Sequence, residues 1–89
     1  MTQKTVTVSL TEEKRASFAS ELVRLAGTFE STIWIEQEPK RINAKSIMGV
    51  LSLGVKNGIV FTIIASGSDE EKALQAISNL AERGSAGAK

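Results

Sequence analysis

The stretch IVFTIIASGSDEEKALQAISNLA, residues 59–81, carries the clearest structural pattern in the chain. Its first part alternates as a strand with one buried face does, and the apolar side consists of Ile59, Phe61, Ile63 and Ala65. Ser68 and Glu71 then have the spacing of a capping box, and apolar residues recur at helical intervals up to Gly84. The stretch therefore predicts a buried strand followed directly by an amphipathic helix.

The residues before this stretch show the same kinds of pattern. They predict strands at residues 4–10, 31–37 and 40–43, a helix that ends at Gly27 and begins between residues 12 and 16, and a short helix at residues 46–55. Pro39 marks a turn, so the two strands beside it should pair as a hairpin. The order β-α-β-β-α-β-α is typical of a two-layer α+β sandwich, and periodicity alone favours a ferredoxin-like arrangement.

The size and composition of the chain favour one small globular domain. Its 89 residues suffice for a single domain at residues 1–83, and the small, polar residues 84–89 are expected to form a disordered tail. Apolar runs are too short to span a membrane, and the N-terminus lacks a signal-peptide core, so we expect a cytoplasmic protein. A net charge of +1 argues against direct binding of nucleic acid.

The absence of histidine and cysteine limits the chemistry available to the chain. It excludes disulfides, zinc–thiolate sites, imidazole metal ligands and nucleophilic catalysis by histidine-activated groups. The clustered carboxylates, at residues 12–13 and 69–71, lie where the first turns of helices favour acidic side chains. We therefore expect no enzyme activity, no metal and no cofactor.

The segment KSIMGVLSL, residues 45–53, has apolar residues around most of its circumference. Val50 and Leu53 share one side of the expected helix, and a second group consists of Ile47, Met48 and Leu51. A short surface helix cannot bury both sides, so the second group either binds a partner or is covered locally. Ser46 is the natural N-cap of this helix and a candidate phosphorylation site, with basic residues nearby at Lys40, Arg41 and Lys45.

Two stretches, NAKSIMGVLSLGVKNG (residues 43–58) and TIIASGSDEEKALQAISNL (residues 62–80), strongly resemble HPr, the histidine-containing phosphocarrier of the bacterial sugar phosphotransferase system. The resemblance covers nearly the whole chain. It implies an α+β open-faced two-layer sandwich with a four-stranded antiparallel sheet in the order 1-4-2-3 and three helices on one face. This strand order replaces the ferredoxin-like expectation.

The histidine site of the family is degenerate in this sequence. A family motif of the form G-[IL]-H-A-R-P-A corresponds here to EKRASFA, residues 13–19. Arg15 occupies the histidine position, and Ser17 and Phe18 occupy those of the motif arginine and proline. Because a guanidinium is not a phosphoryl acceptor, the resemblance implies that phosphocarrier activity is absent.

The second site of the family is the serine of KSIMG, here Ser46. The resemblance implies that HPr kinase/phosphorylase phosphorylates it and that the product is a cofactor of the regulator CcpA in carbon catabolite repression. The implied partner-binding residues are Ile47, Met48, Leu51, Arg15 and Lys45. A lost histidine with a retained serine is most similar to the Crh (catabolite repression HPr-like) branch, although that branch keeps the motif arginine and proline.

A second interpretation assigns function to the sheet face opposite the helices. The strand pattern places Trp34, Val60 and Ile64 outward on that face, among threonines. These residues are either scattered surface apolar groups or a surface for a partner or a homodimer. The alternative to a phosphorylated regulator is therefore a degenerate HPr-like binding module that no kinase modifies.

Overall fold

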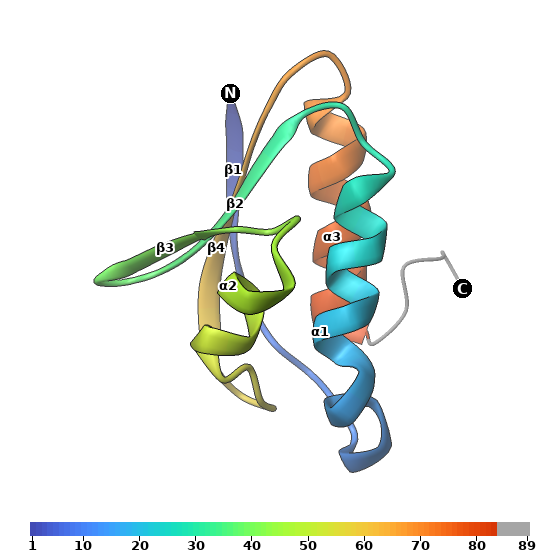
Figure 1. Ribbon diagram of the computed structural model, residues 1–89, viewed down its shortest axis with the longest axis vertical. Helices are drawn as coiled ribbons and strands as arrows, with labels where there is room; N and C mark the ends of the chain where they lie inside the picture. The colour runs from blue at the N-terminus through green and yellow to red at the C-terminus, as the bar shows by residue number, and fades with distance from the viewer. Residues whose placement is uncertain (84–89) are drawn as a thin grey trace.

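The computed structural model describes residues 1–83, which form a four-stranded sheet with three helices on one face (Figure 1). In chain order the elements are β1 (Thr2–Thr7), α1 (Glu12–Gly27), β2 (Thr32–Gln37), β3 (Lys40–Asn43), α2 (Ile47–Leu53), β4 (Val60–Ser66) and α3 (Glu70–Arg83). The predicted order of elements is confirmed. The expected disordered tail, residues 84–89, lies outside the described residues.

The sheet has the order β1-β4-β2-β3, and every pairing is antiparallel. The order implied by the family resemblance is confirmed, and the ferredoxin-like arrangement is wrong. β4 lies between β1 and β2, with Phe61 opposite Val6 and Ile63 opposite Ile35. An interior position suits β4 because four of the five residues at positions 61–65 are buried, namely Phe61, Ile63, Ile64 and Ala65. Periodicity describes each strand alone and carries no information on which strands pair.

The core lies between the sheet and the helices. The sheet contributes Val6, Ile33, Ile35, Phe61, Ile63 and Ala65, and the helices contribute Phe18, Leu22, Ala26, Val50, Ala73, Ile77, Leu80 and Ala81. Helices α1 and α3 run alongside each other over the sheet, and α2 packs against α1 and lies beside β3 (Figure 1). This arrangement leaves one side of α2 directed away from the core.

Helix α1 takes the earlier of its two expected starting points. Thr11 is its N-cap, since the Thr11 hydroxyl accepts the backbone N–H of Lys14 at 3.2 Å. Glu12 and Glu13 occupy the first turn, where the positive end of the helix dipole stabilises negatively charged carboxylates. The degenerate motif is therefore helical throughout, and Arg15 lies within the helix rather than in a loop before it.

The first strand ends at Thr7, earlier than the predicted residue 10. The next residues bond elsewhere: Val8 N–H donates to the Ile59 carbonyl and Ser9 N–H donates to the Ala81 carbonyl, each at 2.8 Å. Val8 and Leu10 are nevertheless buried, as their alternation predicts. Residues 8–10 thus connect β1 to α1 while packing into the core.

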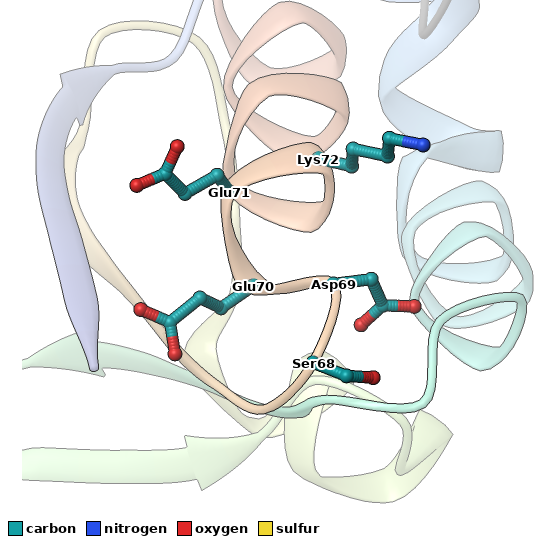
Figure 2. Close-up of a pocket in the computed structure, with 5 residues that line it drawn as sticks. All are labelled: Ser68, Asp69, Glu70, Glu71 and Lys72. Carbon is teal, nitrogen blue, oxygen red and sulfur yellow. The ribbon is translucent and has the colours of Figure 1, made fainter.

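The start of α3 corrects the predicted capping box. The helix begins at Glu70, and its carboxylate, rather than that of Glu71, accepts the Gly67 N–H at 3.0 Å. The Asp69 carboxylate accepts the Ser31 hydroxyl and the backbone N–H groups of Ser31 and Glu30. Asp69 points toward the α1–β2 connection and Glu70 toward β1 (Figure 2). Only the carboxylate half of the capping box forms, one residue earlier than predicted, because Gly67 has no side chain to return the contact.

Acid is expected to destabilise this connection through Asp69. The Ser31 hydroxyl, and after it the Glu30 N–H, lower the pKa of Asp69 below its usual value of 3.8. A carboxyl with a lower pKa in the folded state stabilises the fold above its unfolded pKa, and that stability is lost as the pH falls through the folded value. We expect the urea midpoint to be steady near neutral pH and to fall progressively below about pH 5.

Ser31→Ala tests the cause of this acid sensitivity. Removal of the hydroxyl should raise the pKa of Asp69 toward its usual value, so the variant should be less stable at neutral pH and should lose less stability on acidification. Ser20→Ala, at an exposed position of α1, is the matched control and should follow the wild-type profile. Parallel pH profiles for Ser31→Ala and the wild type would contradict the assignment.

The helix-free face of the sheet is less apolar than the sequence predicts. Ile64 lies on this face, as its alternation predicts, but it is only 3% exposed and therefore forms no part of an open apolar surface. Its partners in the neighbouring strands are Gln3 and Trp34, and the adjacent Thr5 and Thr62 share a hydrogen bond of 2.9 Å.

Within residues 1–83, no helix is both long and apolar enough to cross a membrane.

Candidate functional site

Ser46 occupies the N-cap of α2, as predicted. Its hydroxyl oxygen accepts the Gly49 N–H at 3.2 Å, and its carbonyl accepts the Val50 N–H at 3.0 Å. The seven-residue helix ends at Leu53 and is capped by Gly54, whose φ of +63° is in the left-handed region that favours glycine. The side chain of Ser46 is partly exposed at the entrance to a short helix that carries no charged residue.

The apolar residues after Ser46 are exposed, which resolves the choice left open by the sequence. Met48 is 74% exposed, Leu51 58% and Ile47 40%, whereas Val50 on the inner side is 1% exposed. We call Ile47, Met48 and Leu51 the α2 patch. Nothing in residues 1–83 buries it, so an apolar surface lies beside a serine hydroxyl.

The nearby lysines support α2 instead of surrounding Ser46. Lys45 Nζ donates to the Phe29 carbonyl at 2.8 Å and thereby joins the start of α2 to the α1–β2 connection. Lys40 Nζ donates to the Ser52 carbonyl at 3.0 Å, at the C-terminal end of α2, where a cation is favourable. Neither lysine is held at the Ser46 hydroxyl by these contacts, so Lys45 has a structural role that the sequence did not indicate.

Arg41 also lies apart from the serine. Its guanidinium is 6.0 Å from the centre of the Trp34 ring and forms an ion pair of 3.6 Å with Glu36. These contacts place Arg41 on the opposite face of the sheet, since Trp34 belongs to the helix-free side. Proximity in sequence to Ser46 therefore did not predict proximity in space.

Arg15 and Leu51 meet at a small pocket between α1 and α2. The pocket has a volume of about 120 Å³ and is lined by Arg15, Ala16, Phe18, Ala19, Val50, Leu51, Gly54 and Val55. Arg15 is exposed and forms an ion pair of 3.6 Å with Glu12, one turn earlier. The structure thus brings the degenerate histidine position and the α2 patch together, since Arg15 and Leu51 line the same hollow.

A second hollow does not assemble catalytic groups. It has a volume of about 480 Å³, opens at the start of α3 and is lined by Ser68, Asp69, Glu70, Glu71 and Lys72 (Figure 2). Asp69 and Glu70 are already bound to the fold, since the N-terminal amine also pairs with Glu70 at 3.1 Å. Among the described residues, no group of three or more acidic side chains is placed to hold a metal ion.

An open-faced antiparallel sandwich with a serine at the head of an exposed apolar helix defines a protein of the HPr class. The family described as "PTS HPr component phosphorylation site" matches residues 2–83, and the chain belongs to this family. The solved structure of the phosphocarrier protein HPr from Bacillus anthracis is 42% identical and superposes with a TM-score of 0.85, covering 91% of this chain and 96% of that one.

Within the family, the chain is similar to proteins named Crh. The HPr-like protein Crh of Halalkalibacterium halodurans is 42% identical over 77 residues, or 86% of this chain and 92% of the relative. The crystal structure of Bacillus subtilis Crh is 36% identical, with a TM-score of 0.65 over 83% of this chain and 80% of that one. That structure is described as an intertwined dimer with a swapped domain.

Proposed function

We propose that this protein is a non-catalytic regulator of carbon catabolite repression that receives phosphate on Ser46. In this proposal HPr kinase/phosphorylase is the modifying enzyme, and a CcpA-type transcription regulator is the partner, both in the cytoplasm. The observation that carries the proposal is the Ser46 hydroxyl at the head of a helix whose neighbouring apolar side chains are open to solvent. The similarity to Crh proteins supports the choice of kinase and regulator.

The arginine at position 15, where the family has its histidine, supports the proposed loss of phosphocarrier activity. A phosphoryl acceptor needs a nucleophilic lone pair, and the charged guanidinium has none to offer. The surrounding first turn adds Glu12 and Glu13, whose negative charge opposes the approach of a phosphate. The chain contains no histidine at any position, so no neighbouring imidazole replaces the missing acceptor.

Ser46 offers the chemistry that Arg15 lacks. Its oxygen can attack the γ-phosphoryl group of ATP, the bond to the β-phosphate oxygen breaks, and the hydroxyl proton is transferred to a base of the kinase. The phosphate brings a charge of about −1.5 to −2 at neutral pH beside the α2 patch. A partner that contacts both the α2 patch and the phosphate can therefore distinguish the phosphorylated protein from the unmodified one.

The proposal is tested by incubation with HPr kinase/phosphorylase and ATP, followed by mass spectrometry. The wild type should gain a single phosphate, and Ser46→Ala should gain none. Ser52→Ala is the matched control, because Ser52 lies exposed on the same helix and donates only to the Gly49 carbonyl. Incubation with enzyme I and phosphoenolpyruvate should leave the protein unlabelled. An unmodified wild type in the kinase reaction would contradict the proposal.

The same experiment separates the alternative function. An HPr-like binding module that no kinase modifies would remain unphosphorylated and could act as a homodimer. The swapped dimer described for Bacillus subtilis Crh is the observation that favours self-association. The helix-free face gives it less support than the sequence predicted, because Ile64 is buried and Arg41 lies over Trp34.

A further inference from the structure

The turn between α2 and β4 contains the dipeptide Asn57-Gly58, and both residues are exposed. Asn-Gly is the dipeptide most prone to spontaneous deamidation, because glycine has no side chain to hinder attack of its own amide nitrogen on the preceding side chain. Gly58 has a φ of +94°, and a Cβ built there would meet no atom within 4 Å. The dipeptide is therefore accessible to water and free of steric protection.

Both reacting groups are nevertheless engaged by the same short segment of the chain. The nucleophile, the Gly58 nitrogen, donates to the Val8 carbonyl at 2.8 Å. The electrophile belongs to the Asn57 amide, whose Oδ1 accepts the Leu10 N–H at 2.9 Å. The Val8 N–H completes the set by donating to the Ile59 carbonyl at 2.8 Å. The 56–59 turn and residues 8–10 are thus joined by three hydrogen bonds.

Residues 8–10 are themselves anchored in the core. Val8 is 1% exposed and Leu10 9%, and the Ser9 N–H donates to the Ala81 carbonyl in α3 at 2.8 Å. Movement of residues 8–10 away from the turn requires these side chains to leave the core. The opening is consequently a local unfolding event with its own free energy, separate from the motions of the exposed turn.

We propose that Asn57 is a deamidation site whose reaction is gated by release of residues 8–10. After release, the Gly58 nitrogen loses its proton and bonds to Asn57 Cγ, the Cγ–Nδ2 bond breaks, and ammonia leaves with that proton. Water then opens the cyclic imide at either carbonyl, which gives aspartate or isoaspartate. Each product adds one negative charge at neutral pH and lowers the net charge of the chain from +1 to 0.

The gate predicts a specific pattern of rates. Purified protein is incubated at mildly alkaline pH, and the peptide containing residue 57 is followed by its gain of one mass unit and by isoaspartate detection. The folded wild type should deamidate at least about tenfold more slowly than the same chain in denaturant, because only the released state reacts. Asn43 and Asn79, which precede alanine and leucine, are internal references. Asn57→Gln should abolish the signal.

Val8→Ala and Val50→Ala form the decisive pair. Both remove the same atoms from side chains that are 1% exposed, but only Val8 belongs to the gate. After correction for the measured global stability of each variant, Val8→Ala should react several-fold faster than Val50→Ala. Equal corrected rates would show that global unfolding controls the reaction, and equal rates in the folded and denatured wild type would show that no gate exists. Either result, or an inert Asn57 in denaturant, overturns the proposal.

Discussion

Gly67→Ala is expected to destabilise the protein by about 3 kcal/mol, from overpacking and from an unfavourable backbone conformation together. Gly67 has a φ of +153°, and a Cβ at this position would lie 2.6 Å from Ser31 Oγ and 2.7 Å from Ser31 Cα. The second atom belongs to the backbone, so a change of side-chain rotamer cannot relieve the contact. Ser31 is also held in place by its hydrogen bonds to Asp69.

Gly54→Ala separates the steric contact from the backbone conformation. Gly54 has a φ of +63°, and a Cβ there would meet no atom within 4 Å, so its substitution should cost only about 1 kcal/mol. Urea denaturation of both variants, followed by circular dichroism, measures the difference. A loss of several kcal/mol is a large part of the total stability of a small domain. Equal losses in the two variants would contradict a clash with Ser31.

Leu51→Ser is expected to weaken binding of the Ser46-phosphorylated protein to a CcpA-type regulator by about thirtyfold, which corresponds to a hot-spot contribution of about 2 kcal/mol. Leu51 is 58% exposed, and it lines the pocket that Arg15 shares. Its side chain therefore lies near the centre of the proposed contact surface, where apolar groups become fully desolvated. Because the residue packs little in the free protein, the free energy of unfolding should change by less than about 0.5 kcal/mol.

Val60→Ser is the matched control for Leu51→Ser. Val60 is 49% exposed and lies in β4 on the helix-free face, on the other side of the sheet from the α2 patch. The control should leave the affinity unchanged in titration calorimetry with the phosphorylated protein. Equal affinities for both variants and the wild type would exclude the α2 patch from the interface. A loss confined to Val60→Ser would move the binding surface to the sheet.

The predictable part of the site depends on signals that are local in sequence. Ser46 at an N-cap, and a helix with apolar residues on two sides, are visible within ten residues, and the structure confirms both. The early start of α1 is likewise encoded locally, by Thr11 and the acidic residues after it. The strand order was available only through the family resemblance, because pairing joins residues as far apart as Thr2 and Ala65.

The missed features depend on contacts between distant residues. The bond from Lys45 to the Phe29 carbonyl spans 16 residues, and the bonds of Asp69 to the 30–31 backbone span 38 and 39. The alternation placed Ile64 correctly on the helix-free face, but it did not predict that Ile64, between Gln3 and Trp34 of the neighbouring strands, would be only 3% exposed. At the start of α3, Asp69 is likewise engaged in a contact with Ser31 that no local pattern encodes.

The two lysine contacts of α2 have a consequence for how this protein can diversify. A seven-residue helix with an internal glycine has little intrinsic stability, and here Lys45 and Lys40 form hydrogen bonds near its two ends while Val50 is buried beneath it. Its outer residues Met48 and Leu51 are mostly exposed and contribute less to holding it there. Substitutions on the outward side, made by evolution or by a protein engineer, can therefore change which protein the helix binds while the fold beneath it stays the same.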